Sequence, residues 1–280
     1  MSLVAIATCA GEDVDPDSRP LLDALAAQDV VGQLARWDDP QVDWDRFDLV
    51  VIRSTWDYAP RRDEFLSWAK GVVRLANPFA VVAYSSDKHY LGDLASRGHR
   101  VVASFFCDLG VAPVFPEVDF VVKPSVGAGS LDAERYAAND LERAARHVKR
   151  LHDTGRDVLI QPYVSSVDER GERALVFIDG AFSHAMTKAA MLNVTELDRH
   201  ALYRREQLSL AQGEPDAVAF AEALLAERDF DALLYARVDL VREEDGWALM
   251  ELELVEPSLF LTHYPRAATS LASAVARRLA

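Results

Sequence analysis

The sequence predicts an α/β protein, α+β overall, with a doubly wound N-terminal domain, a small α+β lobe and a C-terminal lobe built on antiparallel sheet. In the first hundred residues, short apolar runs alternate with stretches whose apolar residues recur at helical spacing, which is typical of a parallel sheet covered by helices. After residue 170, two Asp-Gly dipeptides each separate a pair of strand-like runs, which indicates hairpins. We expect domains at residues 1–103, 104–164 and 165–280.

The N-terminal domain opens with a short apolar run, an acidic turn at residues 11–17 and a helical pattern that begins at a proline. The dipeptide Asn77-Pro78 indicates the end of this unit. We expect strands at residues 4–7, 30–37 and 48–52, and helices at residues 20–27 and 65–73.

The rest of the chain shows weaker but similar signals. Gly98 is expected to end a helix, because glycine is common just past helix C-termini. Residues 192–214 are polar and weakly patterned, so we expect a loop there. The remaining expected elements are strands at residues 120–124 and 158–163 and helices at residues 87–94, 141–151, 218–225 and 267–279.

Composition narrows the classes of partner. The 30 Lys and Arg residues stand against 45 Asp and Glu, a formal net charge of −15, so the protein repels a phosphate backbone or an anionic membrane. No apolar run reaches the ~18 residues of a membrane-spanning helix, and no targeting leader is recognised. Cys9 and Cys107 suit free thiols in a reducing compartment. We expect a cytoplasmic protein with a small-molecule substrate; the oligomeric state stays open, a homodimer included.

The most informative pattern is the second Asp-Gly hairpin. Because side chains alternate across a strand, Arg237 and Asp239 share one face, and Glu251 and Glu253 share one face of the next strand. A three-residue loop closed by a left-handed Gly246 puts Asp239 opposite Glu251 and Arg237 opposite Glu253. A two-residue Asp-Gly loop would instead put an apolar residue opposite Asp239.

This register brings three carboxylates together, and they repel one another unless a cation lies between them. Oxygen ligands favour a hard divalent ion, so Asp239, Glu251 and Glu253 are expected to bind magnesium, with manganese as an alternative. The other interpretation is an acidic, solvent-facing hairpin. The strong apolar alternation beneath the charges disfavours it.

A second candidate site combines Lys123, at the end of an apolar strand, with a loop that contains Gly127, Gly129 and Ser130. Glycines let backbone amides approach phosphate oxygens, and a lysine supplies a point charge. Taken alone, such a loop is more often a plain turn. The chain lacks the Walker, GxGxxG and HExxH motifs, so a nucleotide site here must be of another type.

The first Asp-Gly hairpin carries cationic residues. A two-residue turn at Asp179-Gly180 pairs Gly171 with Lys188 and places Arg173, His184 and Lys188 on one face. This face is either a binding surface for phosphates or a solvated surface, and the sequence favours neither.

The candidate substrate site is Arg53, Ser54, Thr55 and Trp56. These residues follow a buried strand, and open α/β sheets place ligand-binding loops at the carboxyl ends of their strands. Arg53 either clamps a substrate carboxylate or pairs with nearby acids, and Trp56 either contacts substrate or caps the core.

Five short motifs are distributed along the chain: Asp87-Lys88-His89-Tyr90-Leu91, Val121-Val122-Lys123-Pro124, Gln161-Pro162-Tyr163-Val164, Arg237-Val238-Asp239 and Glu251-Leu252-Glu253. Through these motifs the chain resembles the ATP-grasp superfamily, from about residue 30 to its end. Four longer patterns are Arg53-Ser54-x-Trp56, Gln161-Pro162-Tyr163-Val164-x-Ser166-Val167-Asp168, Ser183-His184-Ala185 and Glu253-Leu254-x-Glu256-Pro257-Ser258. Through them the chain is most similar to the glutathione-synthetase-like subgroup that includes the cyclo-ligase of D-cycloserine biosynthesis.

The resemblance implies an ATP-grasp fold that encloses ATP between lobes. It implies that Lys88 and Lys123 hold the α- and β-phosphates and that the loop of residues 127–130 closes over the triphosphate as a lid. Lys188 and Arg237 would face the γ-phosphate. The backbone of Gln161, Pro162, Tyr163 and Val164 would contact adenine, Asp168 the ribose, and Asp239, Glu251 and Glu253 one or two magnesium ions.

The implied activity is an ATP-dependent ligase acting on an amino acid or a small derivative. A substrate carboxylate attacks the γ-phosphate, and a nitrogen nucleophile opens the acyl phosphate to give an amide, ADP and phosphate, in an intermolecular or cyclising reaction. The alternatives are a small-molecule kinase and a non-catalytic ATP-binding module. Many superfamily members carry asparagine where this chain has Glu253, which leaves the metal stoichiometry open. The sequence assigns no role to Glu256, His184, Arg204 or Arg205.

Overall fold

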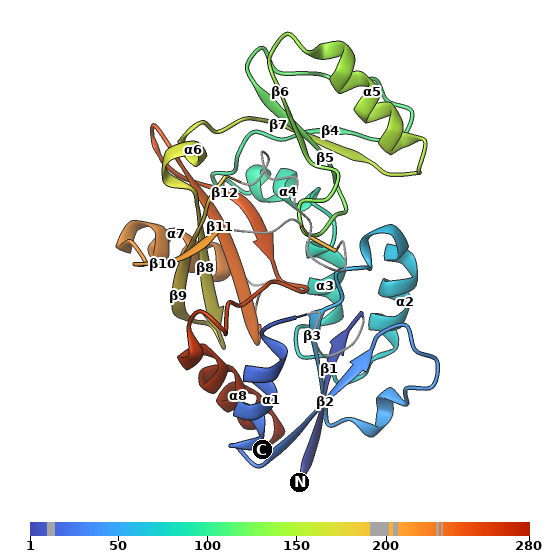
Figure 1. The fold of residues 1–280 in the computed structure, drawn as a ribbon, viewed down its shortest axis with the longest axis vertical. Coiled ribbons are helices and arrows are strands. Elements are labelled where there is room, and N and C mark those ends of the chain that lie inside the picture. The colour runs from blue at the N-terminus through green and yellow to red at the C-terminus, as the bar shows by residue number, and fades with distance from the viewer. Residues whose placement is uncertain (10–14, 191–201, 204–206, 228–229, 231) are drawn as a thin grey trace.

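The computed structural model describes residues 1–9, 15–190, 202–203, 207–227, 230 and 232–280. Their strands form three separate sheets, one in each expected part of the chain. Both chain termini lie at the same end of the molecule (Figure 1). The mixed α/β class is confirmed, while the boundaries at residues 103 and 164 remain predictions.

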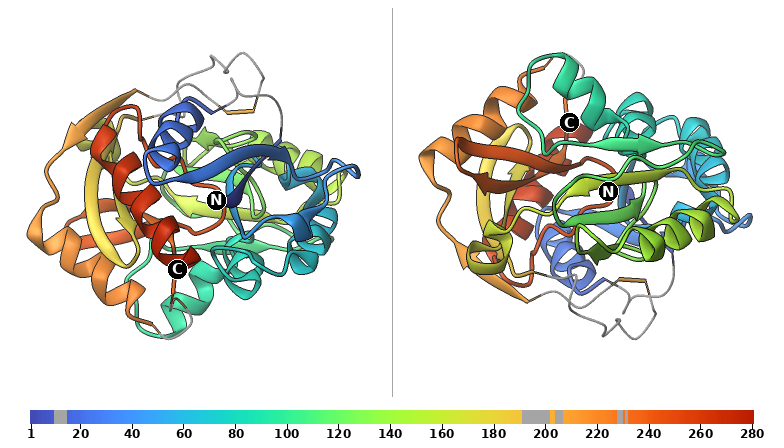
Figure 2. Two further views of the ribbon diagram at one scale, coloured as in Figure 1. Left: turned by 90° about the horizontal axis from the view of Figure 1, so that it is seen from below. Right: turned by 90° about the horizontal axis from the view of Figure 1, so that it is seen from above.

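The N-terminal sheet is parallel, with strand order β2-β1-β3. Alternate side chains of β1 enter different cores, so both faces of the sheet are covered, as expected of a doubly wound unit. Helix α1 packs beside the C-terminal helix α8 (Figures 1 and 2). The elements here are β1 (Ser2–Thr8), α1 (Ser18–Ala26), β2 (Val30–Arg36), β3 (Leu49–Ser54), α2 (Arg62–Gly71), α3 (Phe79–Ser85) and α4 (Tyr90–Ser96), with short 3-10 turns at Trp44–Arg46 and Ala59–Arg61.

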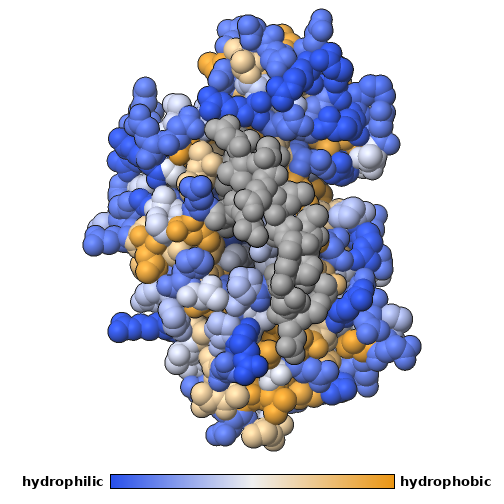
Figure 3. All heavy atoms as spheres, in the orientation of Figure 1, coloured by the Kyte–Doolittle hydropathy of each residue, from blue (hydrophilic) through white to orange (hydrophobic). Residues whose placement is uncertain are grey.

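The central lobe is an antiparallel sheet of order β4-β7-β5-β6. The amphipathic helix α5 packs its apolar stripe on one face of this sheet, where Val148 and Leu151 join the core around Phe120. Mainly hydrophilic residues form the face of this lobe that is seen at the top of Figure 3. Its elements are β4 (Phe105–Cys107), β5 (Phe120–Pro124), β6 (Glu134–Tyr136), α5 (Leu141–His152) and β7 (Val158–Pro162).

The C-terminal sheet is antiparallel, with order β10-β9-β8-β11-β12. One face packs against α4 and α7, and the other packs against α1 and α8, so helices from both the N-terminal and the C-terminal parts cover each face of the sheet. The elements are α6 (Ser166–Arg170), β8 (Glu172–Ile178), β9 (Ala181–Lys188), β10 (Leu208–Ala211), α7 (Pro215–Leu225), β11 (Tyr235–Glu243), β12 (Gly246–Glu253) and α8 (Pro265–Leu279).

The register of the β11–β12 hairpin is confirmed, but the expected loop is wrong. Asp239 pairs with Glu251 and Arg237 pairs with Glu253. The turn, however, is formed by two residues, since Glu243 already pairs with Gly246. A β-bulge in β12 then shifts the register beyond Asp239 by one residue, which produces the pairing that a three-residue loop would have given.

In the β8–β9 hairpin, the expected turn is confirmed but the expected register is wrong. The two-residue turn is confirmed, because Asp179 (φ +52°) and Gly180 (φ +78°) both adopt the left-handed backbone of a type I′ turn. A bulge in β9 then shifts the register, so Lys188 pairs with Glu172 and not with Gly171. The expected cationic face is therefore wrong: Arg173 lies on the face opposite Lys188 and His184.

Several short elements were not predicted from the sequence. The expected loop at residues 192–214 contains β10, which extends the C-terminal sheet by pairing with β9. The strands β4 and β6 have three residues each, too few for a periodic signal. Within the described ranges, none of the helices combines the length and apolar character needed to cross a membrane.

Candidate active site

A cavity of about 530 Å³ lies where the three parts of the chain meet. The N-terminal domain contributes Trp56, and the central lobe contributes Lys123 with the loop of residues 127–131. The C-terminal lobe contributes the charged face of β11 and β12, followed by residues from the segment 255–263. Small-molecule binding sites commonly lie between lobes or domains.

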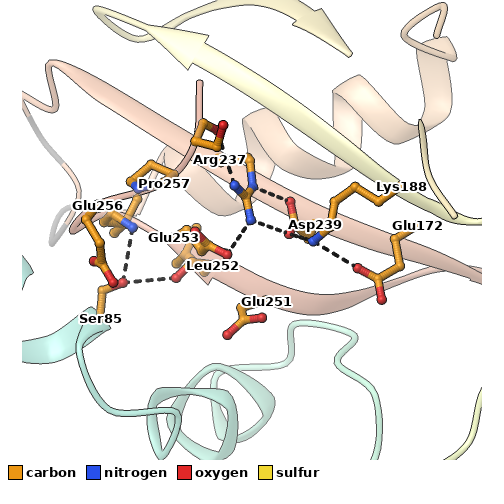
Figure 4. A network of polar contacts seen from close by, with 12 residues as sticks. Ser85, Glu172, Lys188, Arg237, Asp239, Glu251, Leu252, Glu253, Glu256 and Pro257 are labelled. Atoms are coloured by element: carbon orange, nitrogen blue, oxygen red, sulfur yellow. Dashed lines mark hydrogen bonds and ion pairs between the residues drawn. The ribbon is translucent and has the colours of Figure 1, made fainter. Parts of the chain in front are cut away.

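Cationic side chains bind the carboxylates on the charged face (Figure 4). The Arg237 guanidinium donates two 2.9 Å hydrogen bonds to Asp239 and also contacts Glu253. Lys188 Nζ lies 2.8 Å from Asp239 Oδ2 and 3.2 Å from Glu172 Oε2. Asp239 is fully buried, so its paired cations offset the large cost of desolvating a carboxylate.

Glu251 forms a separate ion pair on the same face. Lys88 Nζ lies 2.7 Å from Glu251 Oε1 and donates a 2.9 Å hydrogen bond to the carbonyl of Gly127. Burial would raise the pKa of Glu251, but the charges of Lys88 and Lys123 outweigh burial and lower it to about 2. Lys88 therefore links the acidic face to the glycine loop.

Two further glutamates have too few cationic neighbours to offset their burial. Burial raises the pKa of Glu253 to about 7 although Arg237 opposes the shift, because the charges of Asp239 and Glu251 add to the effect of burial. Burial and the charge of Glu253 raise the pKa of Glu256 to about 8. This part of the cavity therefore favours an additional cation.

The residues only partly fit a bound metal. Glu251 and Glu253 line the cavity and supply the oxygen donors that magnesium prefers. Asp239 does not line it, and both of its oxygens accept hydrogen bonds from Arg237 and Lys188. Among the described residues, no group of three His, Cys, Asp or Glu side chains is arranged to hold a metal ion. A metal bound by all three predicted carboxylates would require these ion pairs to open.

The predicted phosphate-binding residues lie together. Lys88, Lys123, Gly127, Gly129 and Ser130 all line the cavity. Burial lowers the pKa of Lys123. Gly129 is required here, because its φ is +62° and a Cβ would lie 2.6 Å from the carbonyl oxygen of Leu202.

The predicted adenine and ribose residues lie outside the lining of this cavity. Gln161 is buried and donates a 3.0 Å hydrogen bond to Ser104. The Tyr163 hydroxyl donates to Asp168 Oδ1 at 2.6 Å, and Arg135 stacks 3.5 Å from the centre of the Tyr163 ring. Arg135 also lies 3.4 Å from Asp168, so the predicted ribose ligand is held by groups of the protein.

Of the predicted substrate residues, Trp56 lines the cavity and Arg53, Ser54 and Thr55 are buried behind it. Trp56 Nε1 donates to the Glu256 carbonyl at 3.0 Å, and Arg53 Nη1 donates to the Pro257 carbonyl at 2.8 Å. Arg53 also has acidic neighbours, as one of the two interpretations expected.

Several residues near the site were not identified from the sequence. The β9 bulge places Glu172 beside Lys188, and no local pattern predicts a bulge. Arg135 belongs to a segment without a recognised motif, whereas Asp17 lies in the acidic turn at residues 11–17. His184, left open above, packs on Tyr264, and burial lowers its pKa to about 4, so it stays neutral inside the core. Arg204 and Arg205 lie outside the described residues.

The chain is similar to known proteins over its whole length. Residues 4–77 match the family model of the N-terminal domain of D-cycloserine synthetase DcsG. The cycloserine biosynthesis protein DcsG of Streptomyces lavendulae is 39% identical over 301 aligned positions, which cover 100% of this chain and 99% of that protein. A crystal structure of D-cycloserine synthetase DcsG matches with a TM-score of 0.88 and 36% identity over 100% of both chains. D-alanine–D-alanine ligase from Bacillus anthracis, complexed with ATP, shares the fold at a TM-score of 0.66 and 12% identity over 100% of this chain and 97% of that one.

Proposed function

The chain belongs to the DcsG family of ATP-grasp proteins, and from that premise we propose that it is an ATP-dependent ligase that joins a carboxylate to a nitrogen nucleophile. The observation that carries this function is the cavity itself. Lys88, Lys123 and the glycine loop line the same cavity as Arg237 and the glutamates of β12. Such a space brings a triphosphate and a carboxylate together, which is the main requirement of acyl-phosphate chemistry.

We assign the nucleotide to the end of the cavity beside the central lobe. Lys88 and Lys123 bind phosphate oxygens, and the backbone of residues 127–130 closes over them. Binding of phosphates would draw Lys88 away from Glu251 and release that carboxylate. Residues 161–164 and Asp168 contact the nucleoside, which requires Arg135 to release Asp168.

We assign the metal to Glu251 and Glu253, with Asp239 joining them when its ion pairs open. Magnesium supplies charge neutralisation for the phosphates there, and the number of carboxylates also accommodates manganese. Arg237 and Lys188, released from Asp239, stabilise the negative charge that develops on the transferred phosphoryl group.

The reaction follows from these positions. An oxygen of the substrate carboxylate bonds to the γ-phosphorus as the bond to ADP breaks, which gives an acyl phosphate and ADP. The nitrogen nucleophile then bonds to the acyl carbon, phosphate leaves, and the nitrogen loses a proton. Glu256 lines the cavity and is a candidate acceptor for that proton. No Ser-His-Asp or Cys-His nucleophile is needed.

The substrate is an amino acid or a small derivative that enters past Trp56. The names of the two DcsG proteins that this chain resembles favour a cyclising reaction that yields a cycloserine-type ring. Both cysteines of the chain are buried and unpaired, which agrees with a cytoplasmic enzyme.

The test is ADP release from magnesium-ATP with a panel of D- and L-amino acids and β-aminooxy-alanine, supplied singly and in pairs. Hydroxylamine is included to trap an acyl phosphate as a hydroxamate. Substrate-dependent ADP release with a hydroxamate, lost in Lys123→Ala and Glu251→Gln, is the expected result. A stable phosphorylated product would instead indicate a kinase, and tight nucleotide binding without any ADP release would indicate a binding module.

A further inference from the structure

Behind one end of the cavity, three charged side chains form a buried cluster. Asp15 and Asp17 are each 2% exposed, and Arg53 is 1% exposed. Arg53 Nη2 lies 3.9 Å from Asp15 Oδ2 and 3.9 Å from Asp17 Oδ2, too far for a hydrogen bond. Those two oxygens, and both Nε and Nη2 of Arg53, have no hydrogen-bond partner. In the described part of the chain, half of the buried side-chain nitrogen and oxygen atoms that lack a hydrogen-bond partner belong to this cluster.

Each side chain is held in place by its other atoms. Asp15 Oδ1 accepts a 2.9 Å hydrogen bond from the Asp17 amide, and Asp17 Oδ1 accepts a 3.0 Å hydrogen bond from the amide of Thr262. Arg53 is fixed by the Pro257 carbonyl and packs over the Tyr235 ring. The free atoms are therefore oriented by the fold, and their missing partners do not result from loose side chains.

The cluster lacks one positive charge. Two carboxylates and one guanidinium sum to a net charge of −1 in a region closed to solvent. An uncompensated buried charge is costly. Burial is the largest cause that raises the pKa of Asp15, to about 6, and the charge of Arg53 only partly opposes it. A single cation placed against the free oxygens would restore neutrality.

The cluster borders the cavity through Asp17, although the free oxygens themselves are covered in this structure. Asp17 lines the cavity together with Thr262 and His263. Arg237, at the reacting end, donates to the Ser258 carbonyl and packs over Phe260, and both of these residues line the same wall as Thr262. The segment of residues 258–262 therefore connects Arg237 with Asp17 along the lining of the cavity. The position of Asp17 before α1 does not explain its free oxygen, because its side chain forms no capping hydrogen bond.

We propose that Asp17, supported by Asp15 and Arg53, binds the ammonium group of an amino-acid substrate. The proposal rests on the proposed ligase function and adds to it the residues that recognise the amine of the amino-acid substrate. The amine contacts Asp17 Oδ2 once the side chains that cover this oxygen move aside, and the carboxylate then points toward Arg237. Asp15 and Arg53 are positioning residues, and Arg53 in this arrangement holds the two aspartates and does not clamp a carboxylate.

The experiment compares two ligands that differ by one amine, D-cycloserine and isoxazolidin-3-one, by calorimetry with the full chain and magnesium-ADP. We expect the amine to improve affinity at least tenfold in the parent protein. Asp17→Asn should remove that preference and leave the affinity for magnesium-ADP unchanged. The matched control is Asp23→Asn, at an exposed aspartate on α1 that pairs with Arg19 at the surface, and it should bind like the parent.

The same variants are assayed for ADP release with each active amino acid and its N-acetyl derivative. We expect Asp17→Asn and Asp15→Asn to raise the KM for the amino acid at least tenfold without changing the KM for ATP. The melting temperature gives a further test, because the loss of a purely structural ion pair would lower it. Because each substitution removes the excess negative charge, the free protein should melt no lower than the parent.

The outcomes separate the two proposals. ADP release that is indifferent to the amine, or an Asp17→Asn variant that keeps the amine preference, would overturn the ammonium site and leave the ligase intact. A clear fall in melting temperature together with unchanged KM would also overturn it. Failure of every amino acid to release ADP, with no binding of D-cycloserine, would overturn the ligase function and the subsite together.

Discussion

Glu253→Gln should stabilise the nucleotide-free protein, most strongly above neutral pH. The pKa of Glu253 is about 7 in the folded protein against an ordinary value of 4.5, so folding favours its protonated form. A group with a raised pKa contributes stability at low pH that is lost as the pH rises, here between about 4.5 and 7. Glutamine resembles the protonated form and still accepts a hydrogen bond from Arg237, so the variant escapes that loss.

The size of the effect follows from the shift in the pKa. At about 1.4 kcal/mol per pKa unit, the full loss approaches roughly 3 kcal/mol at pH 8. The Glu253 side chain is 28% exposed, and solvent screening reduces the expected gain to about 2 kcal/mol. Near pH 5.5 most of the loss has not yet occurred, so the expected gain there is below about 1 kcal/mol.

The assay is urea unfolding of the parent and the variant from pH 5.5 to 8, with and without magnesium-ADP. Glu142→Gln, at an exposed glutamate of α5, is the control and should match the parent throughout. Magnesium supplies the missing positive charge, so magnesium-ADP should stabilise the parent more than Glu253→Gln. An equal stability difference at every pH, or a variant less stable than the parent at pH 8, would refute the reasoning.

Three further predictions concern the same site and its supports. Gly129→Ala should raise the KM for ATP at least tenfold, because a Cβ at this left-handed position meets Leu202; steady-state kinetics with an unchanged KM would contradict it. Asn77→Ala should lower the free energy of unfolding by about 3 kcal/mol, because buried Asn77 makes three hydrogen bonds to backbone atoms of the C-terminal lobe; urea unfolding measures it, and a loss below about 1 kcal/mol would count against it. Asp239→Asn should cost about 3 to 5 kcal/mol of stability, since it leaves Arg237 and Lys188 buried without their shared carboxylate; a melting temperature equal to that of the parent would show that the network contributes little.

Sequence periodicity located most of the long elements but missed short ones. The helix at Leu141–His152 and the strand at Phe120–Pro124 lie where apolar spacing predicts them. The short strand Leu208–Ala211 was missed, because it forms only by pairing with the edge of β9. A strand of this length is stabilised by its neighbour and carries little signal of its own.

The candidate site was predicted only where it depends on residues close together in the sequence. The phosphate-binding residues gather as expected, because Lys123 ends a strand and the glycine loop follows it directly. The adenine-binding segment keeps its place after β7, but Arg135 from β6 engages Tyr163 and Asp168 there. That contact joins residues about thirty positions apart, and no local pattern indicates it.

The sequence by itself determined which side chains share a face, because alternation along a strand is a local property of the backbone. It thereby placed Arg237 with Asp239 and Glu251 with Glu253. Only the tertiary structure decided what lies opposite each of them. Bulges in β9 and β12 set the register, and the cluster of Asp15, Asp17 and Arg53 forms where segments distant in sequence pack against residues 257–262. Register and partner depend on how whole strands pack together, and the energies that choose among alternatives are spread over contacts that no short stretch of sequence contains.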